Sequence, residues 1–161
     1  MGPPGAAPLA LDASLCRDFV AASSREWLET NGRGSYAMGA VAACATRRYH
    51  GFLTVARRPP LGRFQLINRL EETVVQGSSR FSLSCQTYPG VERPLESERL
   101  ESFRLDPFPV WTFVIGRSTI ERSFFLRYGE DTGVVTYRLL TGTPAEMEVR
   151  PLLSFRDHHG L

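Results

Sequence analysis

Short segments in which apolar and polar residues alternate fill most of the chain between Arg63 and Leu153. Alternation with a period of two is typical of half-buried β-strands. Glycine and proline residues separate the segments at roughly 8–12-residue intervals, as in β-sandwiches. No interval is long enough for the helix that joins two parallel strands. The sequence therefore predicts an all-β fold, a large antiparallel β-sandwich of two sheets. The expected strands cover residues 63–66, 72–76, 81–85, 98–104, 110–115, 119–127, 132–141 and 146–153.

The N-terminal residues differ from this pattern. Residues 1–11 are rich in proline, glycine and alanine, which predicts a flexible lead-in. Residues 12–24 allow two interpretations, because apolar residues stand at helical spacing but a short strand at residues 15–19 fits almost as well. We therefore divide the chain into a lead-in with a short first element, residues 1–24, and one β-sandwich domain, residues 25–161.

The most informative stretch is residues 26–53, EWLETNGRGSYAMGAVAACATRRYHGFL. Its Asn31-Gly32-Arg33-Gly34 segment predicts a tight turn, because asparagine and glycine tolerate positive φ angles. The small residues that follow, up to Ala45, allow neighbouring backbone to approach closely. The Arg47-Arg48-Tyr49-His50 segment is a dense cluster of hydrogen-bond donors. Taken alone, the stretch predicts a hairpin with a polar rim.

Four motifs resemble a known family. They are EWLETNGRGSYA at residues 26–37, RRYHG at 47–51, LEET at 70–73 and RPLLSFRDHH at 150–159. In this order they are similar to the N-terminal domain of bacterial and archaeal glycogen-debranching enzymes, glycoside hydrolases of the amylo-α-1,6-glucosidase type. The resemblance implies a large β-sandwich. It also implies that the catalytic acids lie in a following α-helical barrel domain, so we expect no catalytic residue in this chain.

Three positions depart from the family pattern: Ser35 replaces a glycine, Phe52 a leucine and His158 an aromatic residue such as tyrosine. The family domain continues beyond the RPLLSFRDHH motif, so we expect the chain to be truncated before the helical domain and the sandwich to lack at least one strand. An uncovered sheet edge exposes unpaired backbone groups and apolar side chains. We therefore expect the isolated chain to be poorly soluble or to self-associate.

A polar cluster in these motifs is the candidate site, and two roles are open for it. In the first, which we favour, its members pin strand ends or dock against the downstream α-helical catalytic domain. In the second, they shape the mouth of a cleft for an α-glucan such as glycogen or limit dextrin. Trp27 is the better candidate for stacking on a sugar ring, whereas Trp111 lies in a run that predicts burial. The candidate residues are Trp27, Asn31, Gly32, Gly34, Tyr36, Arg47, Arg48, Tyr49, His50, Arg156, Asp157 and His158. A free-standing, non-enzymatic β-sandwich that binds carbohydrate or another protein is the alternative function.

Several kinds of chemistry find no support in the sequence. Glycoside hydrolysis needs two carboxylates that flank the scissile bond, but no pair stands out among the 17 acidic residues, and Glu71 and Glu72 point to opposite faces of a strand. The 3 histidines lack metal-binding spacing, so we expect no metal. All 19 basic residues are arginine, which removes Schiff-base and P-loop lysine chemistry and leaves no indication of a cofactor. A net charge of +2 predicts no nucleic-acid partner.

The three cysteines are widely spaced and form no zinc-type pair. Cys44 and Cys85 fall within apolar strand patterns, which predicts buried, inert thiols of the kind expected in the reducing cytoplasm. The N-terminus lacks the basic start and the apolar run of a signal peptide. No segment approaches the roughly 18 apolar residues of a membrane span. We therefore expect a cytoplasmic protein without membrane contact.

Overall fold

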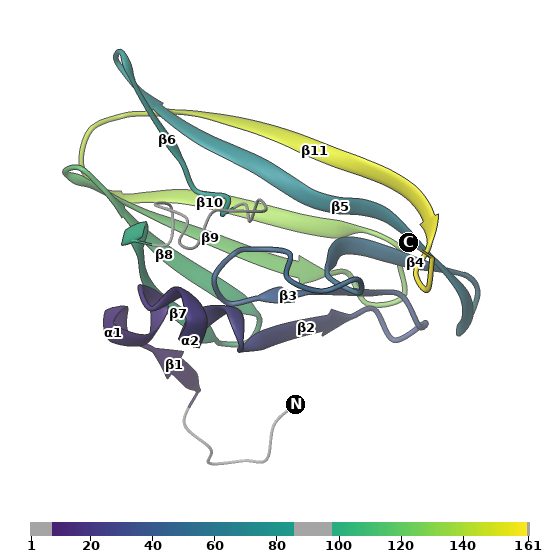
Figure 1. Cartoon of the computed structure of the whole chain (residues 1–161). Coiled ribbons are helices and arrows are strands. Elements are labelled where there is room, and N and C mark those ends of the chain that lie inside the picture. The colour runs from purple at the N-terminus through teal and green to yellow at the C-terminus, as the bar shows by residue number, and fades with distance from the viewer. Residues whose placement is uncertain (1–7, 86–97, 161) are drawn as a thin grey trace.

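Two antiparallel sheets pack face to face in the computed structural model of the chain, which describes residues 8–85 and 98–160 (Figure 1). The first sheet contains, in spatial order, β1 (Leu9–Leu11), β7 (Leu100–Leu105), β8 (Pro109–Ile115), β9 (Ser118–Leu126) and β10 (Gly133–Thr141). The second sheet contains β11 (Glu146–Asp157), β5 (Leu61–Gln76), β4 (Gly51–Arg58), β3 (Tyr36–Ala40) and β2 (Glu26–Thr30), and β6 (Ser79–Ser82) pairs with β5. The predicted all-β antiparallel sandwich is confirmed.

Two short helices, α1 (Ala13–Cys16) and α2 (Phe19–Ser23), lead from β1 to β2. Asp12 and Asp18 cap them: the Asp12 carboxylate accepts from Ser14 N and Leu15 N, and the Asp18 carboxylate accepts from Ala21 N. Of the two interpretations of residues 12–24, the helical one is therefore correct, with a break between the helices. Within the part of the chain that the structure describes, no helix is long and apolar enough to span a membrane.

Two expected irregular segments are only partly described. Residues 9–11 form β1 and pair with β7, so this part of the expected flexible lead-in is wrong. Residues 1–7 lie outside the described residues, as does the loop expected at residues 88–97. The strand expected at residues 81–85 is shorter than predicted, because β6 ends at Ser82.

The long strands β5 and β11 differ most from the predicted boundaries. β5 is a single strand of 16 residues, where two separate segments were expected. β11 continues to Asp157 instead of ending at Leu153. The register of β11 against β5 shifts on both sides of Leu153. Such irregularities interrupt the period-two alternation, and they explain why residues 154–157 resembled a segment leaving the sheet.

Aromatic side chains from both sheets fill the core. Trp27 packs edge-on against Trp111 of the opposite sheet, with 5.3 Å between ring centroids, and Phe52 packs edge-on against Phe124 at the same distance. The Trp111 indole Nε1 donates a 3.0 Å hydrogen bond to Val41 O, so the polar edge of this fully buried ring is paired. Trp27 is only 3% exposed, so the expected stacking of its ring on sugar is wrong. Both tryptophans are core residues.

A buried ion pair joins the two sheets. Arg122 Nη1 on β9 lies 2.6 Å from Glu72 Oε2 on β5, and both residues are 1% exposed. Tyr137 on β10 donates to the other Glu72 oxygen, and burial together with the Glu72 charge raises the pKa of the Tyr137 phenol. The Arg122 guanidinium also lies 4.0 Å from the Trp111 ring centroid. Glu72 is therefore a structural carboxylate that fixes one sheet on the other.

Cys44 and Cys85 form a disulfide, which corrects the prediction of two inert thiols. Their Cα atoms lie 4.9 Å apart, within the range that a disulfide spans. Their predicted burial is right, since each residue is 3% exposed. No local pattern indicated the pairing, because the two cysteines are 41 residues apart in sequence. Cys16 is a free thiol, and burial raises its pKa to about 11.

Candidate functional site

The hairpin of β2 and β3 carries the first part of the candidate site. Leu28 is the Cα partner of Met38, and Thr30 is the partner of Tyr36. Trp27 points into the core, and side chains alternate between the two faces of a strand. The four paired residues therefore lie on the outer face of the second sheet, where Leu28 is 57% exposed.

The turn of this hairpin, residues 31–35, is fixed by hydrogen bonds. Asn31 is completely buried, and its Oδ1 accepts from Arg33 N at 2.9 Å and from Ser35 N at 3.2 Å. The Ser35 hydroxyl donates to Asp131 Oδ1 at 2.6 Å and accepts from Ala56 N at 2.9 Å. Ser35, which departs from the family pattern, thus ties the hairpin to its neighbours.

Gly34 places the end of this turn against Pro60. Its φ angle is +96°, and a Cβ atom added here would lie 2.7 Å from Pro60 Cα. The Gly34 carbonyl oxygen accepts a 2.7 Å hydrogen bond from Arg63 Nε. The close approach of two backbone segments therefore requires glycine and also positions Arg63.

We expect Gly34→Ala to lower the free energy of unfolding by about 2–3 kcal/mol, because left-handed backbone strain and a steric clash act together. Gly77→Ala is the matched control: Gly77 has a φ angle of +59°, but an added Cβ would meet no atom within 4 Å. Its cost should be the strain alone, about 1 kcal/mol. Urea denaturation followed by circular dichroism measures both values. Equal losses would contradict the close packing of Gly34 on Pro60.

His50 and Glu26 fix the loop that follows β3. Thr46 N donates to His50 Nδ1 at 3.0 Å, so Nδ1 is an acceptor. The proton of the neutral ring is therefore on Nε2, which donates to Glu26 Oε1 at 2.8 Å. Arg47 pairs with the other oxygen of the same carboxylate at 2.6 Å. Because His50 is only 2% exposed, it braces the loop and does not face solvent.

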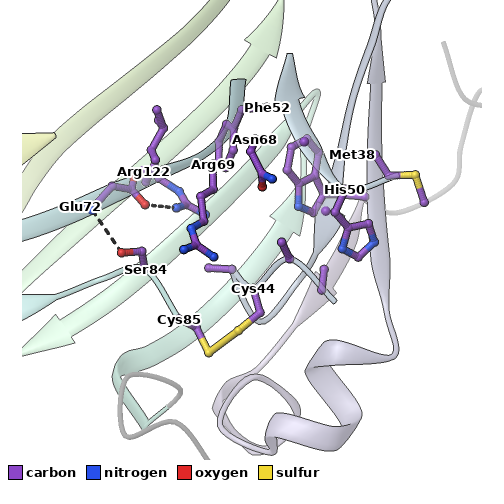
Figure 2. A pocket seen from close by; sticks show the side chains of 17 residues that line it. Met38, Cys44, His50, Phe52, Asn68, Arg69, Glu72, Ser84, Cys85 and Arg122 are labelled. Carbon is purple, nitrogen blue, oxygen red and sulfur yellow. Dashed lines mark hydrogen bonds and ion pairs between the residues drawn. A yellow bond between two sulfur atoms is a disulfide. The ribbon is translucent and has the colours of Figure 1, made fainter. Parts of the chain in front are cut away.

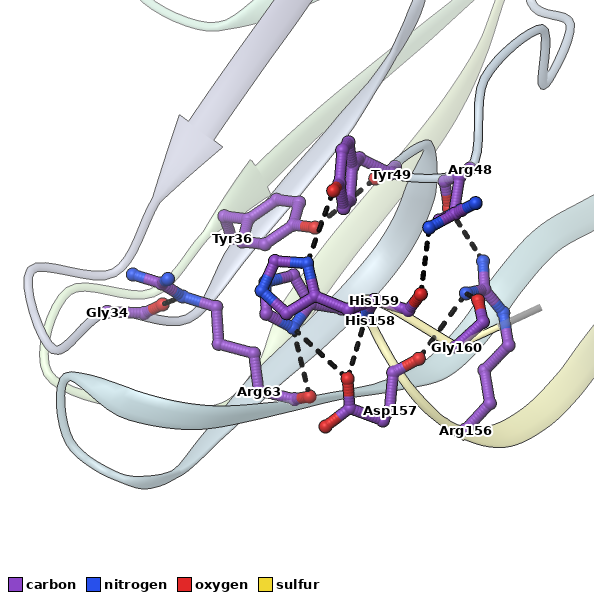
Figure 3. Close-up of polar contacts among 10 residues, drawn as sticks. All are labelled: Gly34, Tyr36, Arg48, Tyr49, Arg63, Arg156, Asp157, His158, His159 and Gly160. Atoms are coloured by element: carbon purple, nitrogen blue, oxygen red, sulfur yellow. Dashed lines mark hydrogen bonds and ion pairs between the residues drawn. The ribbon is translucent and has the colours of Figure 1, made fainter.

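The last residues of the described chain meet this loop (Figure 3). Arg156 Nη2 donates to Arg48 O at 2.6 Å, and Arg48 Nη1 donates to His159 O at 2.9 Å. The Tyr49 hydroxyl lies 3.2 Å from His159 Nδ1. The Asp157 carboxylate accepts a 2.8 Å hydrogen bond from His159 N. Two motifs that are far apart in sequence are therefore in direct contact, as expected.

A groove of about 400 Å³ lies between the β2–β3 hairpin and these last residues. The Tyr49 ring lies 5.8 Å from the His158 ring, and the Tyr36 ring lies 6.5 Å from it, measured between centroids. A volume of this size is ordinary for small-molecule sites, which span roughly 300–1,000 Å³. The groove is lined by Leu28, Thr30, Gly34, Ser35, Tyr36, Met38, Tyr49, Arg63, His158 and His159.

His158 is held firmly at the groove wall. Its backbone N–H donates to Arg63 O at 3.1 Å, and its ring Nδ1 lies 3.3 Å from the same oxygen, so Nδ1 carries a proton. Partial burial, followed by the neighbouring His159, lowers the pKa of His158 below its ordinary value. The neutral ring therefore predominates at pH 7 and offers a flat face and one free acceptor, which suits an uncharged polar ligand.

The groove offers binding groups but no pair of catalytic carboxylates. None of its lining residues is Asp or Glu, and glycoside hydrolysis requires two carboxyl groups. Within the described ranges, no group of three or more His, Cys, Asp or Glu residues is placed to hold a metal ion. The described groove presents aromatic faces, hydroxyl groups and one guanidinium.

Comparison with known proteins identifies the family. A family model described as glycogen debranching enzyme N terminal matches residues 25–161. The chain belongs to this family. The match spans the sandwich from β2 onward and includes every residue that lines the groove. Residues 25–161 are therefore the N-terminal, non-catalytic, β-rich domain of a glycogen debranching enzyme. Searches of curated proteins and of solved structures give no significant match.

In this debranching-enzyme domain, the predicted site residues fall into groups with different surroundings. Those that line the groove are Gly34, Tyr36, Tyr49 and His158. Those that brace its walls through hydrogen bonds are Arg48, Arg156 and Asp157. Those that are buried are Trp27, Asn31 and His50. The two that lie elsewhere are Arg47, paired with Glu26, and Gly32, which packs under the Tyr128 ring.

Sequence reasoning missed several groove residues in this domain. Leu28 and Met38 alternate with residues that face the core, so the period-two pattern alone was enough to place them on the outer face. Arg63 and His159 enter the groove through contacts between segments that are distant in sequence. No local signal marks these two residues, so only the tertiary structure reveals them.

Proposed function

We propose that this domain supports the catalytic domain of a glycogen debranching enzyme and helps to position α-glucan, with the groove as its sugar contact. The observation that carries the proposal is the convergence of three family motifs, residues 26–37, 47–51 and 150–159, on one aromatic-lined groove. The glycoside hydrolase activity of the whole enzyme and a cytoplasmic location, both implied by the family, belong to the same proposal.

The chemistry of the groove suits a pyranose. A sugar ring has an apolar C–H face that packs on aromatic rings and hydroxyl groups that need hydrogen-bond partners. Tyr36 and Tyr49 supply ring faces and hydroxyl groups, and the neutral His158 ring supplies an acceptor. Arg63 adds a charged donor at the lining. Apolar walls with a few polar groups are typical of ligand sites in proteins.

The arginines of the cluster fit a supporting role. Arg48 and Arg156 donate to backbone carbonyl oxygens of the chain itself. Their hydrogen bonds hold the loop at Tyr49 against the last described residues. We therefore divide the two roles considered for the cluster: the arginines pin the walls, and the aromatic residues contact glucan.

The outer strand β11 supports the proposed contact with the catalytic domain. Leu153 and Phe155 on this strand are 76% and 75% exposed. An edge strand with exposed apolar side chains is a common site of protein contact. The expected self-association of the isolated chain rests on the same exposure and stays a prediction.

We expect maltooligosaccharide to bind the chain weakly, with a dissociation constant of about 10 mM, because two or three contacts of roughly 1 kcal/mol each are available. Titration followed by NMR should shift signals of Tyr36, Tyr49 and His158. Tyr36→Ala should weaken binding about fivefold, since one ring contact is worth about 0.5–1.5 kcal/mol.

Tyr128→Ala is the matched control for this titration. Tyr128 is 86% exposed but does not line the groove. Its replacement should leave the affinity unchanged. An equal loss of affinity in the two variants, or signal shifts that avoid the groove, would show that glucan binds elsewhere or not at all.

A further inference from the structure

A second, small cavity lies beside the disulfide, inside the sandwich (Figure 2). It has a volume of about 20 Å³, and Cys44, Cys85, Arg69, Arg122 and Glu72 are among its lining residues. Figure 2 shows the Arg69 guanidinium pointing into this cavity, toward the side formed by Cys44 and Cys85. The disulfide therefore shares a small cavity with two arginine side chains.

Among the residues that the structure describes, the charges around this cavity do not cancel. Glu72 is shared between Arg122 and Tyr137, which use its two oxygens. Arg69 has no ion-pair partner among the described residues, and its Nε atom is buried without a hydrogen-bond partner. A positive charge beside a cysteine stabilises the thiolate and so opposes burial, which disfavours the thiolate. The reduced form of the Cys44–Cys85 pair would thus find a compensating charge in place.

The disulfide also holds the loop that forms one wall of the groove. Residues 41–50 contain no helix or strand, and Cys44 lies near their middle. Ala43 has a φ angle of 58°, a left-handed conformation that costs a residue with a side chain about 1–2 kcal/mol. The same loop ends at Tyr49, which lines the groove. The cystine therefore clamps a strained segment whose far end faces the proposed sugar site.

We propose that the Cys44–Cys85 disulfide is a thiol–disulfide exchange site, and that its reduction by a dithiol releases the loop of residues 41–50 and loosens the Tyr49 wall of the groove. In the exchange, the dithiol loses two electrons and two protons and closes into its own disulfide, and Cys44 and Cys85 become two thiols. Because both cysteines are 3% exposed, attack requires local opening of the loop. The effect on glucan rests on the proposed function, whereas the exchange itself does not.

The exchange is tested on the full chain with graded ratios of reduced to oxidised dithiothreitol, followed by alkylation and mass spectrometry. We expect Cys44 and Cys85 to be alkylated together under native conditions while Cys16, whose pKa is raised to about 11, stays unmodified. Alkylation of Cys16 in parallel with the pair would mean that reduction follows global unfolding, and would overturn the proposal. So would a pair that stays oxidised at every ratio.

Two variants test the role of the Arg69 charge. Arg69→Gln should raise the ratio of reduced to oxidised dithiothreitol at the midpoint of reduction about three- to tenfold. The reason is that loss of one nearby positive charge raises a thiol pKa by up to about one unit. Arg80→Gln is the control, since Arg80 pairs with Glu148 on the exposed surface and does not line the cavity. Equal midpoints for the two variants would remove Arg69 from the site.

The coupling between the disulfide and the groove is measured in a separate experiment. NMR signals of Tyr49 and His50 should shift on reduction, and those of Arg80 and Glu148 should not. Reduction, or the Cys44→Ser/Cys85→Ser variant, should also weaken maltooligosaccharide binding severalfold. If the groove binds no sugar at all, the shifts at Tyr49 still test the coupling. Unmoved Tyr49 signals in a reduced, folded chain would refute it.

Discussion

Replacing Glu72 with alanine is expected to lower the free energy of unfolding by about 3–5 kcal/mol, because it leaves the charge of Arg122 buried without a partner. Arg122 and Glu72 lie 2.6 Å apart and are both 1% exposed, so bulk solvent does not compensate the charge of Arg122 when the carboxylate is lost. Tyr137 loses its hydrogen-bond acceptor in the same variant. Urea denaturation of the wild type and the variant measures the difference.

Two further variants show whether burial is the cause. Glu148→Ala breaks an exposed pair with Arg80, and we expect almost no change in stability because exposed ion pairs contribute little. Adding Arg122→Met to Glu72→Ala should recover part of the loss, since a buried ion pair can often be replaced by apolar side chains. A Glu72→Ala variant as stable as Glu148→Ala would contradict the role of this pair in joining the sheets.

Trp111→Ala should cost about 3–5 kcal/mol, the usual range for removal of a large buried aromatic side chain. Trp111 is fully buried, touches Trp27 and Phe103 at centroid distances of 5.3 Å, and lies under the Arg122 guanidinium. Its removal therefore opens a cavity between the sheets and takes away a contact of the buried cation. Thermal and urea denaturation give the loss.

Trp111→Phe separates packing from hydrogen bonding. Phenylalanine keeps much of the ring volume but leaves Val41 O without the indole donor, so we expect a loss of about 1–3 kcal/mol. The order of stability should be wild type, Trp111→Phe, Trp111→Ala. If the two variants are equally unstable, packing of the ring contributes less than the single hydrogen bond, and the aromatic contacts of Trp111 do not hold the two sheets together.

The fold was predictable because its signals are local. β9 alternates throughout between buried and less buried residues, and β8 does so from Trp111 onward; a two-residue period needs no knowledge of neighbouring strands. The boundaries of β11 were not predictable in the same way. Its bulges interrupt the alternation, and its pairing with β5 over Gln65 and Phe64 is what keeps residues 156 and 157 in the sheet.

The candidate site was predictable only where a motif marked it. Tyr36, Tyr49 and His158 were found through the family resemblance and do line the groove. The disulfide was missed because its cysteines have no characteristic spacing. The buried ion pair could have been predicted from the sequence. Arg122 stands between Ile120 and Phe124 in the alternating pattern, at a position where an apolar residue is expected. A charge at a core-facing position predicts a buried partner.

The contact between the loop at Arg48 and the segment at Arg156 and His159 has a consequence for synthesis on the ribosome. These residues are 108 and 111 positions apart in sequence, and a nascent chain emerges from its N-terminal end. Tyr36 and Tyr49 are therefore translated long before His158 and His159 arrive to complete the groove. At about 5–20 residues per second, the unfinished aromatic wall stays open for several seconds. We therefore expect molecular chaperones to bind the unfinished wall during that interval.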